Sequence, residues 1–253
     1  MDHEERMSLA QTVCDRFVDK YRDNVIIGGV YGSAAKDSDT EWSDLEMLFV
    51  VQDKCKAQAQ QFLYRGIAVN YSVLKRGKLE NILNHPCLEG DMGWPFWMGV
   101  LCVLKILYGD QSQIDSWLQM GDNVPYVEFR KALEKELPGL IFESYGRILS
   151  CKARNNMDDW YCAVLEVLFE MRDALCLLNR SWITHDYYQG LVDTFQFPKL
   201  PRRYKELIPL LWNVQDIDTA ITLARELKEN FQQLLVEQGI RSIEYTGGSD
   251  IPV

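Results

Sequence analysis

The stretch that decides the fold is GGVYGSAAKDSDTEWSDLEMLFVV, residues 28–51. It leaves one apolar segment through Gly32-Ser33, crosses a polar loop and enters a second apolar segment, a pattern that predicts two buried strands. Successive side chains of a strand point to opposite faces, so Asp44 and Glu46 are expected to share one face. Leu45 then points toward the core.

Two carboxylates on one face repel each other unless they are protonated or bridged by a cation. Mg²⁺ is commonly held by one or two carboxylates together with the phosphates of a substrate. Gly32 would let a phosphate approach the backbone, and Ser33 can donate a hydrogen bond to a phosphate oxygen. The stretch therefore predicts a nucleoside triphosphate site in which Asp44 and Glu46 hold Mg²⁺.

The two halves of the chain show different patterns. The first half predicts helices at 4–22, near 54–62, at 78–85 and at 94–110, and strands at 25–31, 44–51 and 67–74. The second half predicts helices at 126–154, 158–179, 183–194, 202–213 and 216–238, with one strand candidate at 240–245. We therefore expect a domain with a sheet at 1–124 and a helical domain at 125–253.

Composition narrows the range of partners. The 253 residues carry a formal net charge of −10, which argues against a general nucleic-acid binder and is compatible with a cationic partner. The longest apolar run, residues 98–107, is too short to span a bilayer, and the charged N-terminus is not a signal peptide. Seven cysteines without a Cys-x-x-Cys pair fit reduced thiols in the cytoplasm.

A Gly-Ser pair, a polar loop and Asp-x-Asp/Glu between two strands resemble the signature of the DNA-polymerase-β-like nucleotidyltransferases. The matching residues are Gly32, Ser33, Asp44 and Glu46. The block 29–50 is similar to that of the kanamycin nucleotidyltransferase (aminoglycoside 4'-O-nucleotidyltransferase) family, including Glu in the second acidic position. Weaker similarities are EERM at 4–7, LYGD at 107–110, KARN at 152–155 and the terminal IPV.

The resemblance implies an α+β fold, with a small mixed sheet in the nucleotidyltransferase domain and a C-terminal helical bundle. It implies Mg²⁺-dependent transfer of AMP from ATP to a hydroxyl of an aminoglycoside, which confers resistance. It implies catalytic and metal-binding roles for Asp44 and Glu46, and nucleotide contacts for Gly32 and Ser33. It also implies a homodimer with the antibiotic near the subunit interface.

The general base and a nucleotide-binding lysine of that family lie about one turn apart on the first helix of the second domain. Glu143 and Lys152 are the candidates here, but they are nine positions apart. The ungapped match that aligns Lys152 places Ile148 at the position of the base. Glu143 can be the base only if the helix register shifts. His185 is a further candidate base.

The third predicted strand departs from the family, which has Val-Glu-Val-Asn where this chain has Ile67-Ala68-Val69-Asn70. Ala68 therefore replaces a carboxylate. Glu89, Asp91 and Asp110 are the nearest acids in the sequence that could substitute for it.

Two alternatives remain open. A nucleotidyltransferase acting on another small acceptor, such as a lincosamide or a metabolite, is favoured by Ala68 and by the displaced Glu143. A non-catalytic nucleotide-binding relative is disfavoured because Asp44 and Glu46 are both retained.

Overall fold

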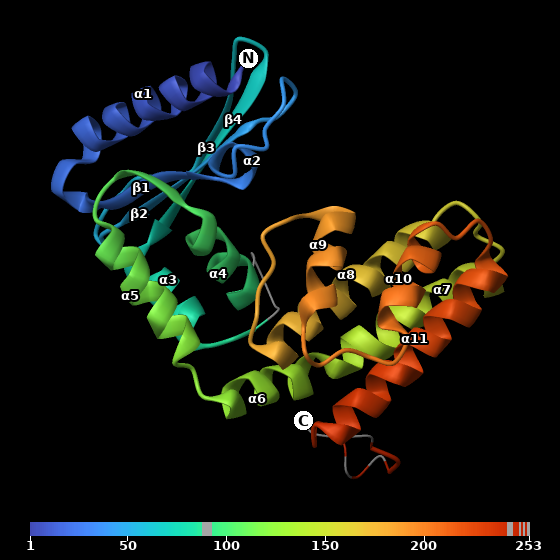
Figure 1. Ribbon diagram of the computed structural model, residues 1–253. Helices are drawn as coiled ribbons and strands as arrows, with labels where there is room; N and C mark the ends of the chain where they lie inside the picture. Colours follow the sequence, from blue (N-terminus) through green and yellow to red (C-terminus); the bar gives the residue numbers. More distant parts are fainter. Residues whose placement is uncertain (88–92, 242–244, 248, 250, 252–253) are drawn as a thin grey trace. The chain divides into compact units, whose positions relative to one another are not determined.

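A five-stranded sheet forms the centre of the first of two units, Met1–Val124 (Figure 1). The computed structural model describes residues 1–87, 93–241, 245–247, 249 and 251. The strand order is β3-β4-β2-β1-β5. The strands are β1 (Val25–Tyr31), β2 (Leu45–Val51), β3 (Gln60–Tyr64), β4 (Ile67–Lys75) and β5 (Lys105–Tyr108). Since β2 runs parallel to β4 and the other neighbours are antiparallel, the sheet is mixed and the predicted α+β class is confirmed.

Helix α1 (His3–Tyr21) covers one face of this sheet (Figure 1). It begins with a capping box, in which Asp2 accepts a hydrogen bond from the backbone of Glu5 and Glu5 accepts one from the backbone of Asp2. The ring of Phe17 stacks on Phe49 of β2 with 3.8 Å between centroids. The buried residues of this layer include Ala10, Cys14, Phe17, Leu45, Met47, Phe49, Val51 and Val69. The odd-numbered positions of β2 therefore face α1.

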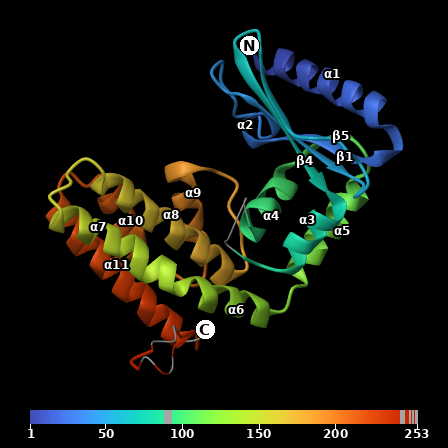
Figure 2. The same cartoon turned by 180° about the vertical axis from the view of Figure 1, so that it is seen from behind.

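Three helices lie on the other side of the sheet: α3 (Arg76–Asn84), α4 (Trp94–Val103) and α5 (Gln111–Asp122) (Figures 1 and 2). Trp94 and Trp117 are fully buried among them. Leu48 and Val50, the inward residues of β2 on this side, are also fully buried. Two short elements complete the unit, η1 (Arg22–Asn24) and α2 (Gly32–Ala35). The sheet is thus covered on both faces along most of β2.

Two sequence predictions in this unit are wrong. The sequence predicts a helix near 54–62, yet no helix forms there and residues 60–64 form strand β3. Arg65 and Gly66 both have positive φ, which suits a two-residue hairpin turn, and the turn pairs β3 with β4. The helix expected over 94–110 ends at Val103, and 105–108 pairs with β1 as strand β5.

The second unit, Pro125–Val253, is helical in its described residues. Its helices are α6 (Tyr126–Leu137), η2 (Pro138–Glu143), α7 (Ser144–Ala153), α8 (Trp160–Asn179), α9 (Tyr187–Asp193), η3 (Thr194–Gln196), α10 (Tyr204–Trp212) and α11 (Ile217–Glu237). Helix α8 contacts α6, α7, α9, α10 and α11, so it is the centre of this bundle (Figure 1). Part of the predicted strand at 240–245 lies outside the described residues. No helix in the described residues has the length and apolarity needed to cross a bilayer.

Candidate active site

Asp44 and Glu46 lie at the start of β2, on the face opposite α1. Glu46 is half-buried between the fully buried Leu45 and Met47, which pack toward α1. Glu46 is in register with Asn70 of β4, so these two side chains share a face. The Asn70 amide Nδ2 donates a 2.9 Å hydrogen bond to Asp44 Oδ2. The two carboxylates therefore lie on one face of the sheet.

Gly32 brings the end of β1 against the second carboxylate. Tyr31 is in register with Glu46, and Gly32 follows it with a φ of +70°. A Cβ atom at Gly32 would overlap Glu46 Oε2, so a larger residue at this position would displace that carboxylate. Ser33 is the next residue, and its carbonyl accepts backbone hydrogen bonds from Lys36 at 3.2 Å and Ser38 at 3.1 Å. Gly32 thus lies directly beside Glu46, and Ser33 follows it in the chain.

This residue set fits a divalent cation that is also bound by a substrate. In the described residues, no group of three or more His, Cys, Asp or Glu side chains is placed to hold a metal ion. Two carboxylates are nevertheless the usual protein contribution to Mg²⁺ when phosphate oxygens complete its shell. Asn70 already orients Asp44, as outer partners of metal ligands do.

Ala68 leaves the neighbouring strand position without a carboxylate. Leu45 is in register with Val69, so Ala68 lies beside Asp44. Asp110 does not replace the missing acid, because it caps α5 by accepting a 2.8 Å hydrogen bond from Ser112 N, which lowers the pKa of its carboxyl. Glu89 and Asp91 lie outside the described residues.

A buried ion pair holds the loop that leads to Asp44. Arg6 of α1 is fully buried and is paired with Asp39, whose side chain is 2 % exposed. His3 Nδ1 lies 2.7 Å from Asp39 Oδ1. Burial raises the pKa of Asp39, but the hydrogen bond with His3 and the charge of Arg6 outweigh it, so the pKa lies below its ordinary value.

We expect Asp39→Asn to destabilise the protein at neutral pH by about 3 kcal/mol, since it leaves Arg6 buried without its counter-charge. A carboxyl whose pKa is lowered by folding stabilises the protein above its unfolded pKa, and this contribution is lost as the pH falls through the folded pKa. The difference between wild type and variant should therefore shrink at acidic pH. Urea unfolding of both proteins between pH 7 and pH 3 measures the difference in their free energies of unfolding. A difference that does not change with pH would contradict the stabilising role of the ionised Asp39 carboxylate.

Glu143 and Lys152, the candidates for the general base and the nucleotide contact in the second unit, have different ion-pair partners. Glu143 is the last residue of η2, it is exposed, and its Oε1 accepts a 2.6 Å hydrogen bond from Arg147 Nη2. Arg147 also pairs with Glu166 of α8. Lys152 instead pairs with Asp218 of α11. The cation one helical turn after Glu143 is therefore Arg147. The sequence analysis missed this residue, although a spacing of four residues on a helix predicts such a contact.

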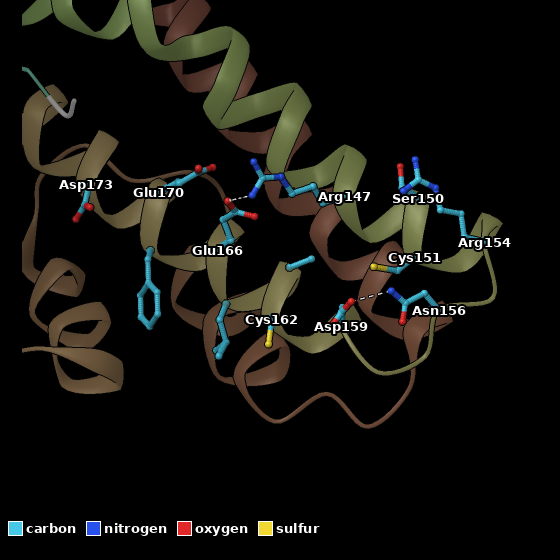
Figure 3. A pocket seen from close by; sticks show the side chains of 13 residues that line it. Arg147, Ser150, Cys151, Arg154, Asn156, Asp159, Cys162, Glu166, Glu170 and Asp173 are labelled. Carbon is cyan, nitrogen blue, oxygen red and sulfur yellow. Dashed lines mark hydrogen bonds and ion pairs between the residues drawn. The ribbon is translucent and has the colours of Figure 1, made fainter. Parts of the chain in front are cut away.

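Arg147 lies at a groove between α7 and α8 with a volume of about 730 Å³ (Figure 3). Its charged lining residues are Arg147, Arg154, Asp159, Glu166, Glu170 and Asp173, so carboxylates outnumber guanidiniums. Burial raises the pKa of Glu170, and its Oε2 has no hydrogen-bond partner within the described part of the chain. His185 is bound to Asp193 at 2.8 Å and is not among the residues that line this groove.

Curated relatives confirm the resemblance drawn from the motif. Two proteins named aminoglycoside nucleotidyltransferase (4'), one from a Bacillus species and one from Staphylococcus aureus, are each 26% identical to this chain over 147 residues. The match covers 58% of this chain and spans only 56% of the length of each relative. No protein-family model matches the chain.

A solved structure shows that the fold is shared. The nucleotidyltransferase-like protein from Exiguobacterium sibiricum superposes with a TM-score of 0.53, over 90% of this chain and 77% of that one. The two sequences are 13% identical, so this likeness concerns the fold alone.

Proposed function

We propose that this protein is an enzyme that transfers AMP from ATP to a hydroxyl of an aminoglycoside antibiotic and so confers resistance. The observation that carries the proposal is the placement of Asp44 and Glu46 on one face of the sheet, beside Gly32 and Ser33. The names of the curated relatives support the reaction class and the acceptor.

Each residue is given a role by the chemistry of the reaction. Asp44 and Glu46 would hold Mg²⁺, which neutralises charge on the triphosphate when it is bound. Gly32 and Ser33 would contact the triphosphate. Glu143 would accept the proton of the acceptor hydroxyl, whose oxygen forms a bond to the α-phosphorus of ATP. The bond between the α-phosphorus and its bridging oxygen then breaks, and pyrophosphate leaves.

A cationic acceptor agrees with the charge of the protein. The net charge of −10 favours attraction of a polyamine-like molecule. The groove of Figure 3 adds four carboxylates beside Arg147, which is itself paired with the proposed base Glu143.

From the same family resemblance we propose that the protein is a cytoplasmic homodimer that binds neither nucleic acid nor a membrane. Its seven free thiols are compatible with a reducing compartment. Sedimentation of the purified protein tests the dimer.

A second candidate is transfer to another small acceptor, such as a lincosamide or a metabolite. It is favoured by Ala68, which lies beside Asp44 where the aminoglycoside-modifying family has a carboxylate. The experiment is transfer of label from α-³²P-ATP to kanamycin, tobramycin and a lincosamide, with Mg²⁺ or with EDTA. Labelled kanamycin or tobramycin only with Mg²⁺ supports the first proposal. Label on the lincosamide alone supports the second, and no Mg²⁺-dependent ATP binding at all contradicts both.

We also propose that Arg147, rather than Lys152, contacts the nucleotide. Arg147→Met should lower kcat/KM for ATP about 10- to 100-fold, since a hydrogen bond to a charged group contributes about 1.5–3 kcal/mol. Lys152→Met removes the same charge from the same helix and should stay near wild type, because Lys152 pairs with Asp218 of α11, whereas Arg147 contacts the proposed base Glu143. The reverse order of effects in steady-state kinetics would restore Lys152 to the site.

A further inference from the structure

The side chain of Arg6, near the start of α1, is fully buried, and its guanidinium donates to the loop between α2 and β2. It is one of the largest fully buried side chains of the described residues. Its Nη1 pairs with Asp39, and its Nη2 donates to the carbonyls of Thr40 at 2.8 Å and Ser43 at 3.0 Å. A weaker contact of 3.4 Å reaches the carbonyl of Met1. One side chain of α1 therefore binds three residues of a loop more than thirty positions away.

A buried arginine is a costly way to hold a surface loop. Taking two charges out of water costs several kcal/mol per ion, and well-packed apolar residues often stabilise a fold as well or better. The guanidinium does what apolar side chains cannot, because its N–H groups donate to backbone carbonyls in a fixed direction. Its Nε is buried without a hydrogen-bond partner in the described residues, so the two terminal nitrogens do the holding.

The Ser43 carbonyl, which accepts from Arg6, belongs to the peptide group that joins Ser43 to Asp44. The Ser43 carbonyl shares its plane with the Asp44 amide, so the hydrogen bond from Arg6 fixes the backbone immediately before that carboxylate. The other side of Asp44 is fixed by Asn70, which donates to Oδ2. The loop is braced internally as well, since Ser43 Oγ accepts a 2.9 Å hydrogen bond from Thr40 N.

We infer that Arg6 is a positioning residue of the active site, which holds Asp44 beside Glu46 through the Thr40 and Ser43 carbonyls. The inference rests on the proposed function for its consequence, because a fixed Asp44 matters when a cation is bound between two carboxylates. Outer residues that orient metal ligands typically contribute 10- to 100-fold to metal affinity or activity. Loss of Arg6 should therefore raise the Mg²⁺ concentration needed for ATP binding about tenfold or more.

The experiment separates positioning from folding by using a compensated variant. Arg6→Met alone leaves Asp39 buried without its counter-charge and is expected to be unstable. The double variant Arg6→Met/Asp39→Leu removes both charges while still losing the bonds to Thr40 and Ser43. Arg16→Met is the matched control, because Arg16 is an exposed arginine of the same helix.

Two quantities are measured for the wild type, the double variant and Arg16→Met. The first is hydrogen–deuterium exchange of the segment 37–46 in the protein without ligands. The second is the Mg²⁺ concentration at half-saturation of ATP binding, followed by calorimetry. We expect the folded double variant to exchange faster over 37–46 and to need at least about tenfold more Mg²⁺, with Arg16→Met unchanged in both.

The outcomes distinguish this inference from the proposed function. A double variant with wild-type exchange over 37–46 and wild-type Mg²⁺ dependence would overturn the role of Arg6 while leaving the proposed function intact. Faster exchange with unchanged Mg²⁺ dependence would also overturn it, since the loop would then be held for stability only. A wild-type protein without Mg²⁺-dependent ATP binding would overturn the proposed function itself, and the role of Arg6 with it.

Discussion

Asp44→Asn is expected to lower the rate of nucleotidyl transfer about a thousandfold without unfolding the protein. The substitution keeps the size of the side chain but removes one of two carboxylates on the proposed metal-binding face. A bound metal ion contributes several kcal/mol by stabilising charge on the phosphates. Each 1.36 kcal/mol corresponds to a factor of about ten in rate. The variant and the wild type are compared in label transfer from α-³²P-ATP.

The stability of the same variant gives an independent test. Asp44 and Glu46 repel each other when no cation is present, so Asp44→Asn should unfold at the same temperature as the wild type or slightly above it. Asp19→Asn on the exposed side of α1 is the control for loss of one negative charge. If Asp44→Asn transfers AMP at nearly the wild-type rate, Asp44 is not a metal ligand. If the variant is strongly destabilised, Asp44 has a structural role instead.

The local pattern of residues 28–51 was enough to place the carboxylates. Alternating apolar and acidic residues after Ser43 leave only one way to bury Leu45 and Met47, so Asp44 and Glu46 must face away from α1. The structure shows the same arrangement through the Asn70 hydrogen bond. Information of this kind lies within one strand and its turn, which is why the sequence alone could predict it.

The edge strands could not be predicted in the same way. β3 is exposed at every residue, so it has none of the alternation that identifies a half-buried strand. Phe62 and Tyr64 are common strand residues, but the segment is short and gives no burial pattern, and its pairing with β4 is what establishes the strand. β5 follows an apolar helix without a polar break, and it is a strand because it pairs with β1. Both errors arise where a strand is established by pairing with its neighbour rather than by its own residue pattern.

The partners of charged side chains were also beyond the sequence. Arg6 binds residues 33 to 37 positions away, and Lys152 pairs with Asp218 at a distance of 66 positions. The periodicity of a helix or strand in the sequence does not predict contacts between residues so far apart in the chain. Arg147 differs, because its bond to Glu143 spans four positions and was available from helical spacing.

Gly32→Ala is expected to impair the site more than the fold. An L-residue at a φ of +70° costs about 1–2 kcal/mol, and the new methyl group would overlap Glu46 Oε2. The Glu46 carboxylate must therefore move from its place next to Asp44 on the same face of the sheet. We expect transfer to fall about 10- to 100-fold, the usual effect of disturbing the shell around a metal.

Gly66→Ala provides the matched control for this prediction. Gly66 has a φ of +85° in the turn between β3 and β4, and a Cβ atom there meets nothing within 4 Å. The two variants therefore share the backbone strain, while only Gly32→Ala collides with a carboxylate. Thermal unfolding should show similar losses in both proteins, and the transfer rate and Mg²⁺ dependence should change in Gly32→Ala alone. Equal losses of transfer in the two variants would mean that strain, not the displaced Glu46, accounts for the effect.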